Sequence, residues 1–163
     1  MMPMNEENQS NEQITLASTS SMRVSLEDLR NGRAGLNQDR KSLLNRVPEI
    51  GDVAFFRVNR VEIEDLAYLS AAVNHEFALL RSKHTDILFH GQATMCIFSE
   101  ALMELVESGK YELVAHSHPD YGPVIPSAED RLFLKLIGQK TSKIISFITG
   151  EIRDYSAERF EDL

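Results

Sequence analysis

The sequence predicts a single α/β domain built around a mixed β-sheet, and three observations lead to this prediction. A length of 163 residues fits one ordinary domain. A content of 42% hydrophobic and 26% charged residues is near the globular average, so the chain can bury a core. From about residue 52, short apolar runs typical of strands alternate with runs of helical spacing. Such alternation favours helices packed on a sheet with parallel and antiparallel strands.

Composition divides the chain into three parts. Residues 1–22 hold no aromatic side chain and are mostly polar, so we expect a disordered tail. Residues 23–49 carry two short helical patterns, which Ser25 and Asn37 are placed to cap. Residues 50–163 contain the dense apolar pattern of the main domain. The first two parts together form an N-terminal extension.

The main domain is expected to alternate strands with helices. The expected strands are 53–58, 76–80, 86–91, 111–115 and 143–150, and the expected helices are 62–73, 93–108 and 127–140. In the helix 93–108, apolar residues recur at helical spacing, namely Ile97, Ala101, Leu102 and Leu105. The only cysteine, Cys96, lies in the same expected helix, where it suits a small buried apolar role.

The charge balance argues against nucleic acid as the main partner. Seventeen Lys and Arg against 25 Asp and Glu give a net charge of -8, whereas phosphate binding needs clustered positive charge. No apolar stretch approaches the ~20 residues that cross a bilayer, and no signal-peptide pattern opens the sequence. We therefore expect a cytoplasmic protein with no membrane contact, whose oligomeric state is left open.

The segment 114–130 carries the residues best suited to chemistry. His116 and His118 lie two apart at the end of an expected strand, so a continued pleat puts both side chains on one face. Three prolines stiffen the loop that follows. Asp130 then falls in the first turn of the next expected helix, behind Ser127 as its N-cap. A carboxylate at that position can turn back toward the histidines.

Two neutral imidazoles and one carboxylate leave the fourth position of a tetrahedral zinc ion open for water, as in catalytic sites. His116, His118 and Asp130 are therefore the expected zinc ligands. Simpler interpretations compete, because a buried histidine is more often a core residue, Asp130 could merely complement the helix dipole, and Ser127 could merely cap the helix. The combination of these residues favours the metal. Of the other histidines, His75 and His84 are expected at the surface, and His90 is expected either near the site or packed in the sheet.

The pattern His-x-His-Pro, a loop, and then Ser-x-x-Asp resembles the JAMM motif of the MPN, or JAB, superfamily of zinc metalloproteases. The order of expected elements is also similar, and residues 97–130 are similar to bacterial RadC-type members. The resemblance implies a three-layer α/β/α domain with a mixed central sheet and one zinc ion per chain, held by His116, His118 and Asp130. It also implies that Ser127 stabilises an oxyanion. Eleven residues separate His118 from Asp130, one more than in the family pattern.

The resemblance further implies a catalytic glutamate on the strand after the first helix, where Glu76 stands. The glycines that follow this glutamate in many members are missing here, as in looser RadC-like members. Chemistry also demands a base, because zinc lowers the pKa of bound water to about 7 but another group must take and return the proton. Other carboxylates compete, but they sit on or beside expected amphipathic helices: Glu62, Glu64 and Glu100.

These features imply a zinc-dependent metallopeptidase or isopeptidase in which Glu76 activates zinc-bound water. The resemblance implies a protein or peptide substrate, with the C-terminal tail of ubiquitin or a bacterial ubiquitin-like protein as the expected target. The alternatives are a RadC-like DNA-associated protein, a non-catalytic MPN scaffold and a structural zinc module. The acidic charge argues against direct DNA binding, and a structural zinc site would need a fourth protein ligand. A papain-like pairing of Cys96 with a histidine has no local signature.

Overall fold

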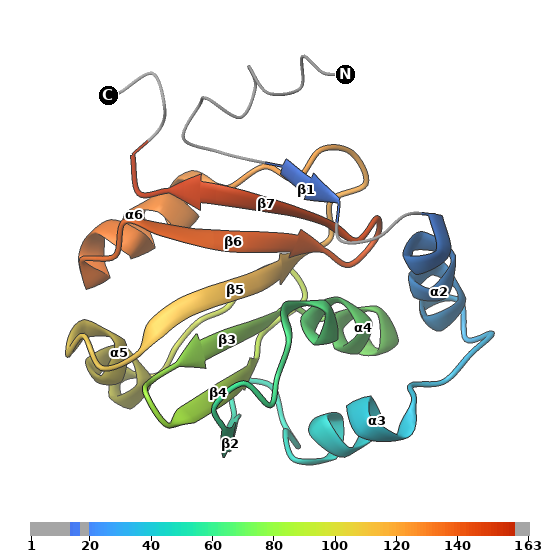
Figure 1. The fold of residues 1–163 in the computed structure, drawn as a ribbon, viewed down its shortest axis with the longest axis horizontal. Coiled ribbons are helices and arrows are strands. Elements are labelled where there is room, and N and C mark those ends of the chain that lie inside the picture. The colour runs from blue at the N-terminus through green and yellow to red at the C-terminus, as the bar shows by residue number, and fades with distance from the viewer. Residues whose placement is uncertain (1–13, 17–19, 159–163) are drawn as a thin grey trace.

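A computed structural model describes residues 14–16 and 20–158, which form a seven-stranded sheet and five helices (Figure 1). The strands are β1 (Ile14–Leu16), β2 (Val53–Arg57), β3 (Phe77–Arg81), β4 (Thr85–His90), β5 (Glu112–His118), β6 (Thr141–Ser146) and β7 (Glu151–Ser156). The helices are α2 (Ser20–Arg30), α3 (Gln38–Asn45), α4 (Ile63–Val73), α5 (Glu100–Glu107) and α6 (Ala128–Ile137).

The sheet is mixed, as the sequence predicts. Its strand order is β1-β7-β6-β5-β3-β4-β2, which Figure 1 shows from top to bottom. The pair β5 and β6 is parallel, and each other neighbouring pair is antiparallel. Helix α6 connects the two parallel strands. This α/β class with a mixed sheet is confirmed.

The helices cover both faces of the sheet, because alternate strand residues enter two separate apolar clusters. Phe77 and Leu79 of β3 belong to the cluster that α2, α3 and α4 complete. Ala78 and Leu80 belong to the cluster that α5 and α6 complete. The helices of segment 23–49 are part of the first cluster, since they bury leucines from both α2 and α3 there.

The N-terminal part is more regular than its composition predicts. Within residues 1–22, the structure describes β1, which pairs with β7, and the first turn of α2. The helix begins at Ser20, so the expected cap at Ser25 is wrong. The expected cap at Asn37 is confirmed, because its side chain accepts a hydrogen bond from Arg40 N at 2.8 Å. Residues 1–13 and 17–19 of the expected tail lie outside the described part.

Two elements of the main domain differ from expectation. The helix expected at 93–108 begins at Glu100, because Ser99 caps it by accepting from Leu102 N at 3.2 Å. Cys96 therefore lies in an extended loop instead of a helix, and Ile97, expected on the apolar helix face, is 56% exposed. The strand expected at 143–150 is β6 and ends at Ser146, after which a turn leads into β7, a strand that the sequence reading missed.

Strand β5 contains an irregularity that sets the direction of its later side chains. Its register with β3 joins Leu113 to Leu80 and Ala115 to Leu79, so Val114 is an extra residue with no partner on β3. Such a bulge changes which residues of a strand face each side. After it, Ala115 faces the cluster of α2 to α4, and His116 opposes Ala78 on the α5 and α6 side.

Candidate metal centre

Strand β5 places the two histidines on one face of the sheet, as the sequence predicts. The residue between them, Ser117, points to the opposite face, where its Oγ contacts Ser70 Oγ at 2.7 Å and accepts from Phe77 N at 2.9 Å. Because these contacts fix the orientation of the strand end, His116 and His118 both face the side covered by α6. The continued pleat assumed from the sequence is therefore present.

The first turn of α6 brings the carboxylate to the histidines. Ser127 is the N-cap of this helix, and its Oγ accepts from Asp130 N at 3.0 Å. In return Asp130 Oδ2 accepts from Ser127 N at 2.9 Å, which completes a capping box. The cap interpretation of Ser127 is correct, and the same cap directs Asp130 toward β5.

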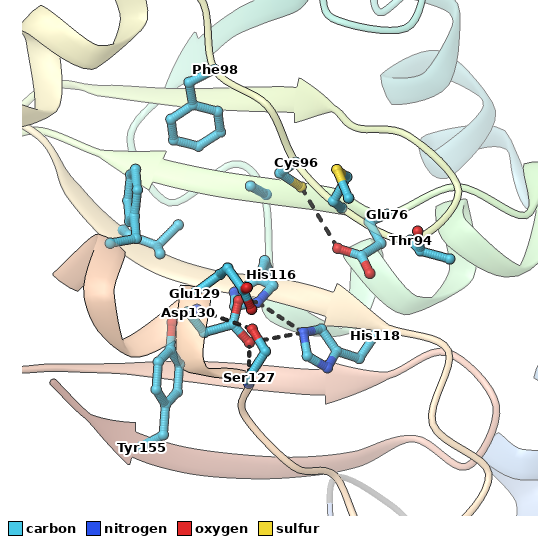
Figure 2. A pocket seen from close by; sticks show the side chains of 14 residues that line it. Glu76, Thr94, Cys96, Phe98, His116, His118, Ser127, Glu129, Asp130 and Tyr155 are labelled. Atoms are coloured by element: carbon cyan, nitrogen blue, oxygen red, sulfur yellow. Dashed lines mark hydrogen bonds and ion pairs between the residues drawn. The ribbon is translucent and has the colours of Figure 1, made fainter. Parts of the chain in front are cut away.

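The three expected ligands converge in the structure (Figure 2). The His116 and His118 Nε2 atoms are 3.1 Å apart, and each lies 3.1 to 3.2 Å from an oxygen of Asp130. Bonds of about 2.0 to 2.1 Å at tetrahedral angles separate zinc ligands by roughly 3.3 Å. The donor types and their spacing therefore fit a zinc ion, and no fourth ligand belongs to this group among the described residues.

Asp120 belongs to this site, although the sequence did not predict it. His118 Nδ1 lies 3.3 Å from Asp120 Oδ2, and Ile125 N donates to the same oxygen at 3.2 Å. Ser146 also donates to the backbone carbonyl of Asp120 at 2.7 Å. A carboxylate behind the second imidazole nitrogen fixes the ring and its tautomer in many metal sites. The feature of the sequence that could have indicated this role is an acidic residue two positions after His118, directly following Pro119.

The loop from His118 to Asp130 combines anchored and exposed residues. Val124 is fully buried, its N–H donates to Glu151 Oε1 at 2.9 Å, and its carbonyl accepts from Arg153 at 2.7 Å. Tyr121, in contrast, is 79% exposed. The loop is thus anchored at Val124, while the side chain of Tyr121 before it is exposed to solvent.

The charges of the metal-free site are strongly coupled. Burial lowers the pKa of His116, which favours its neutral form. Burial would also lower the pKa of His118, but hydrogen bonds to Asp120 and Asp130 outweigh it and raise this pKa to about 10. Burial would raise the pKa of Asp130, but the hydrogen bonds from both histidines hold it well below its ordinary value. Metal binding must therefore displace a proton from His118.

Glu76 lies across the same cavity as the ligands and comes from the neighbouring strand. Continuing the pairing of Ala78 with His116 by two residues sets Glu76 opposite His118. Glu76 is only 3% exposed. Burial raises the pKa of Glu76 to about 8, and the charge of His118 limits the rise. The competing carboxylates of α4 and α5 do not line this cavity.

A cavity of about 500 Å³ contains Glu76, Ser127 and the three ligands together (Figure 2). The loop 91–99 forms one wall, and Cys96 Sγ lies 4.0 Å from Glu76 Oε1. Gly91 allows this approach, because a Cβ atom there would come within 2.7 Å of Cys96 Sγ. This loop, which was expected to be helical, contributes Thr94, Cys96 and Phe98 to the cavity lining.

The remaining histidines stand apart from the ligand cluster. His90 is buried in the sheet, stacks on Phe77 and lies within hydrogen-bond distance of His75 at 2.8 Å. His84 is exposed in the turn between β3 and β4. His84 is exposed and His90 packs in the sheet, whereas His75, expected at the surface, is half-buried beside His90.

Comparisons with protein-family models, with curated proteins and with solved structures find no match to this chain. Among the helices of the described residues, none has the length and apolar character needed to cross a membrane.

Proposed function

We propose that this protein is a zinc-dependent amide hydrolase of the JAMM type, with helices on both faces of its sheet forming a JAB/MPN domain. One observation carries the proposal. Two imidazoles and a carboxylate converge at 3.1 to 3.2 Å inside a cavity that also holds a buried glutamate. Three protein ligands and an accessible cavity are typical of catalytic zinc sites, whereas structural sites are closed by four ligands.

A zinc ion held by His116, His118 and Asp130 would polarise a substrate carbonyl and acidify water in the cavity. The chain itself must hold the ligands in place and move protons. Asp120 keeps His118 oriented, and the capping box keeps Asp130 turned toward the histidines. This fixed arrangement reduces the reorganisation needed when the site works.

Glu76 is proposed as the general base and then the general acid. A carboxylate whose pKa lies near the working pH can accept a proton from water and return it to the leaving amine. The raised pKa of Glu76, about 8 in the metal-free protein, suits this double role, and a bound cation would lower it through its charge. No other carboxylate along the cavity is as buried.

Ser127 is proposed as the donor that stabilises the oxyanion. Its hydroxyl oxygen accepts from Asp130 N, which leaves its hydrogen available to donate. Because Ser127 also lines the cavity beside the ligands, a carbonyl oxygen placed there can receive that hydrogen bond. Hydrolysis of a peptide or isopeptide bond, including one at the tail of a ubiquitin-like protein, is the reaction class that these groups support.

The test is the zinc content of protein purified without added metal or chelator, compared between the wild type, His118→Ala and His84→Ala. His84 is an exposed histidine outside the cavity, so its variant is the matched control. We expect about one zinc ion per chain in the wild type and in His84→Ala, and none in His118→Ala. Absence of zinc from the wild type after zinc is offered would refute the proposal.

Activity is tested separately with Glu76→Gln. This variant is expected to keep its zinc and to lose turnover of peptide and isopeptide substrates, because it removes the proton carrier but no ligand. Full turnover in Glu76→Gln would exclude Glu76 from the mechanism. Zinc binding without turnover in the wild type would instead favour a non-catalytic scaffold.

A further inference from the structure

We propose that the apolar end of the cavity is a specificity pocket for a bulky apolar side chain, preferably aromatic, on a residue that flanks the scissile amide. The inference deepens the proposed function and rests on it. It assigns Phe98 as the residue that determines this specificity, together with Phe133.

The cavity has two chemically different ends. One end holds Glu76, Ser127 and the ligands, with the Tyr155 ring against His116, and the other is lined by apolar side chains, namely Ala78, Phe98, Leu113 and Phe133. In Figure 2, Phe98 lies well away from His118 and Ser127. A volume of about 500 Å³ lies within the range of roughly 300 to 1,000 Å³ found for ligand sites. Such sites combine an apolar lining with a few convergent polar groups.

The apolar end begins directly beside the ligands, because the same elements supply both. Asp130 and Phe133 are three residues apart on α6 and therefore share a helix face. Ala78 opposes His116 across β3 and β5, and its single methyl group leaves room next to the imidazole. A substrate whose carbonyl lies at the metal ligands therefore has this pocket within reach of an adjacent side chain.

The aromatic wall is held in position by ring contacts. The rings of Phe98 and Phe133 meet edge to face with centroids 5.3 Å apart, and Phe98 meets Phe89 in the same way at 4.7 Å. Phe89 is 1% exposed and anchors the pair in the core. Phe98 and Phe133 are each only partly buried and line the cavity. Aromatic rings pair favourably edge to face or offset-stacked, so the accessible parts of Phe98 and Phe133 favour an aromatic ring from a substrate.

This architecture predicts which substrates are cleaved fastest. A large apolar side chain displaces water from the apolar end, whereas alanine or glycine leaves it hydrated. A single methylene in an apolar pocket changes kcat/KM by about 10 to 200-fold. A phenylalanine should therefore be preferred over alanine by at least ~100-fold at one of the two positions beside the scissile bond.

The experiment uses the zinc-loaded full chain and acetylated tetrapeptide amides Gly-X-Y-Gly, with X and Y taken from alanine, leucine and phenylalanine. We expect the phenylalanine preference at X or at Y in the wild type. Phe98→Ala should reduce that preference at least tenfold. Phe98→Leu should restore most of the preference, because it returns apolar bulk to the wall.

Ile97→Ala is the matched control, because Ile97 adjoins Phe98 in the same loop but is exposed and does not line the cavity. Its selectivity should equal that of the wild type. Equal kcat/KM for the alanine and phenylalanine peptides would overturn the pocket while leaving the hydrolase in place. An unchanged preference in Phe98→Ala, with zinc content and thermal midpoint as in the wild type, would overturn it as well.

A binding measurement separates the failure of the pocket from the failure of the proposed function. Zinc-loaded Glu76→Gln is titrated calorimetrically with the same peptides. Binding of the phenylalanine peptide at least tenfold tighter than the alanine peptide, lost in the double variant with Phe98→Ala, supports the pocket even if the wild type cleaves none of them. Equal binding of both peptides, or retained selectivity in the double variant, overturns the pocket independently of catalysis.

Discussion

Replacing Glu76 by glutamine should stabilise the metal-free protein, and the gain should grow with pH. Burial raises the pKa of Glu76 from 4.5 to about 8. Below the lower value, the carboxyl is protonated in both the folded and the unfolded state, so folding carries no ionisation cost. Between the two values only the unfolded state releases the proton, so folding stability falls as pH rises. Above the upper value the cost is complete, and glutamine never incurs it.

The size of this change in folding stability follows from the pKa shift of Glu76. Each pKa unit corresponds to about 1.4 kcal/mol, so the full cost is at most ~5 kcal/mol, of which roughly 3 kcal/mol develops between about pH 5 and pH 8. The assay is urea unfolding of chelator-treated wild type and Glu76→Gln across this range. Replacing a carboxyl by an amide adds an offset that does not vary with pH, so the slope of the difference is the informative quantity. A pH-independent difference between the two proteins would refute the reasoning.

Glu129→Gln supplies the control for this experiment. Glu129 lines the same cavity but is exposed, so its replacement should leave the pH dependence of unfolding unchanged. If Glu129→Gln reproduced the slope of Glu76→Gln, the effect would come from net charge instead of burial. The two outcomes also bear on function, because a buried carboxyl that costs stability is typical of a site that needs the group for chemistry.

Three further predictions concern the groups around the ligands. Zinc binding near neutral pH should release about one proton in the Glu76→Gln background, because the raised pKa of His118 keeps this histidine protonated until the metal binds. Calorimetry in buffers of different ionisation enthalpy measures the number of protons released, and a release of none would contradict the prediction. Asp120→Ala should weaken zinc binding by about 10 to 100-fold in competition with a chromophoric chelator, and unchanged affinity would remove Asp120 from the site. Ser127→Ala should lose about 1 kcal/mol of unfolding free energy, whereas Ser127→Gly, which still caps a helix, should lose only a few tenths. Both Ser127 variants should lower kcat by about 100 to 1,000-fold, and normal turnover in either would refute the oxyanion role.

The ligand cluster could be predicted from sequence because its determinants are local. The two-residue period of a strand places His116 and His118 on one face, and the N-cap preference of Ser127 positions Asp130 one turn into a helix. Asp120 could not be found in this way. Its role depends on a loop that folds back so that Ile125 N reaches the same carboxylate, which is a tertiary arrangement.

The errors in the fold have similar physical causes. Apolar spacing around Cys96 and Ile97 suggested a longer helix, but Phe98 packs on Phe89, and Gly91 N donates a backbone hydrogen bond to Glu76 O that holds the start of the loop. Strand β7 alternates polar and apolar residues only weakly, and its pairing with β1 and β6 defines it. Hydrophobic periodicity and residue propensity depend on neighbours along the chain, whereas the loop 91–99 and strand β7 are fixed by tertiary contacts.

The unpaired Val114 sets the side of the sheet on which the ligands lie. In a regular strand of the same residues Val114 would pair with Leu79, and every later residue of β5 would change sides. Ser117 would then turn toward the cavity, and both imidazoles would turn toward α4, where Ser70 and Phe77 leave no space for them. Deletion of Val114 should keep both imidazoles toward the cavity, because Leu113, Ala115 and His116 would keep their partners on β3. The pairing register of β5 is as essential to this centre as the chemistry of its ligands.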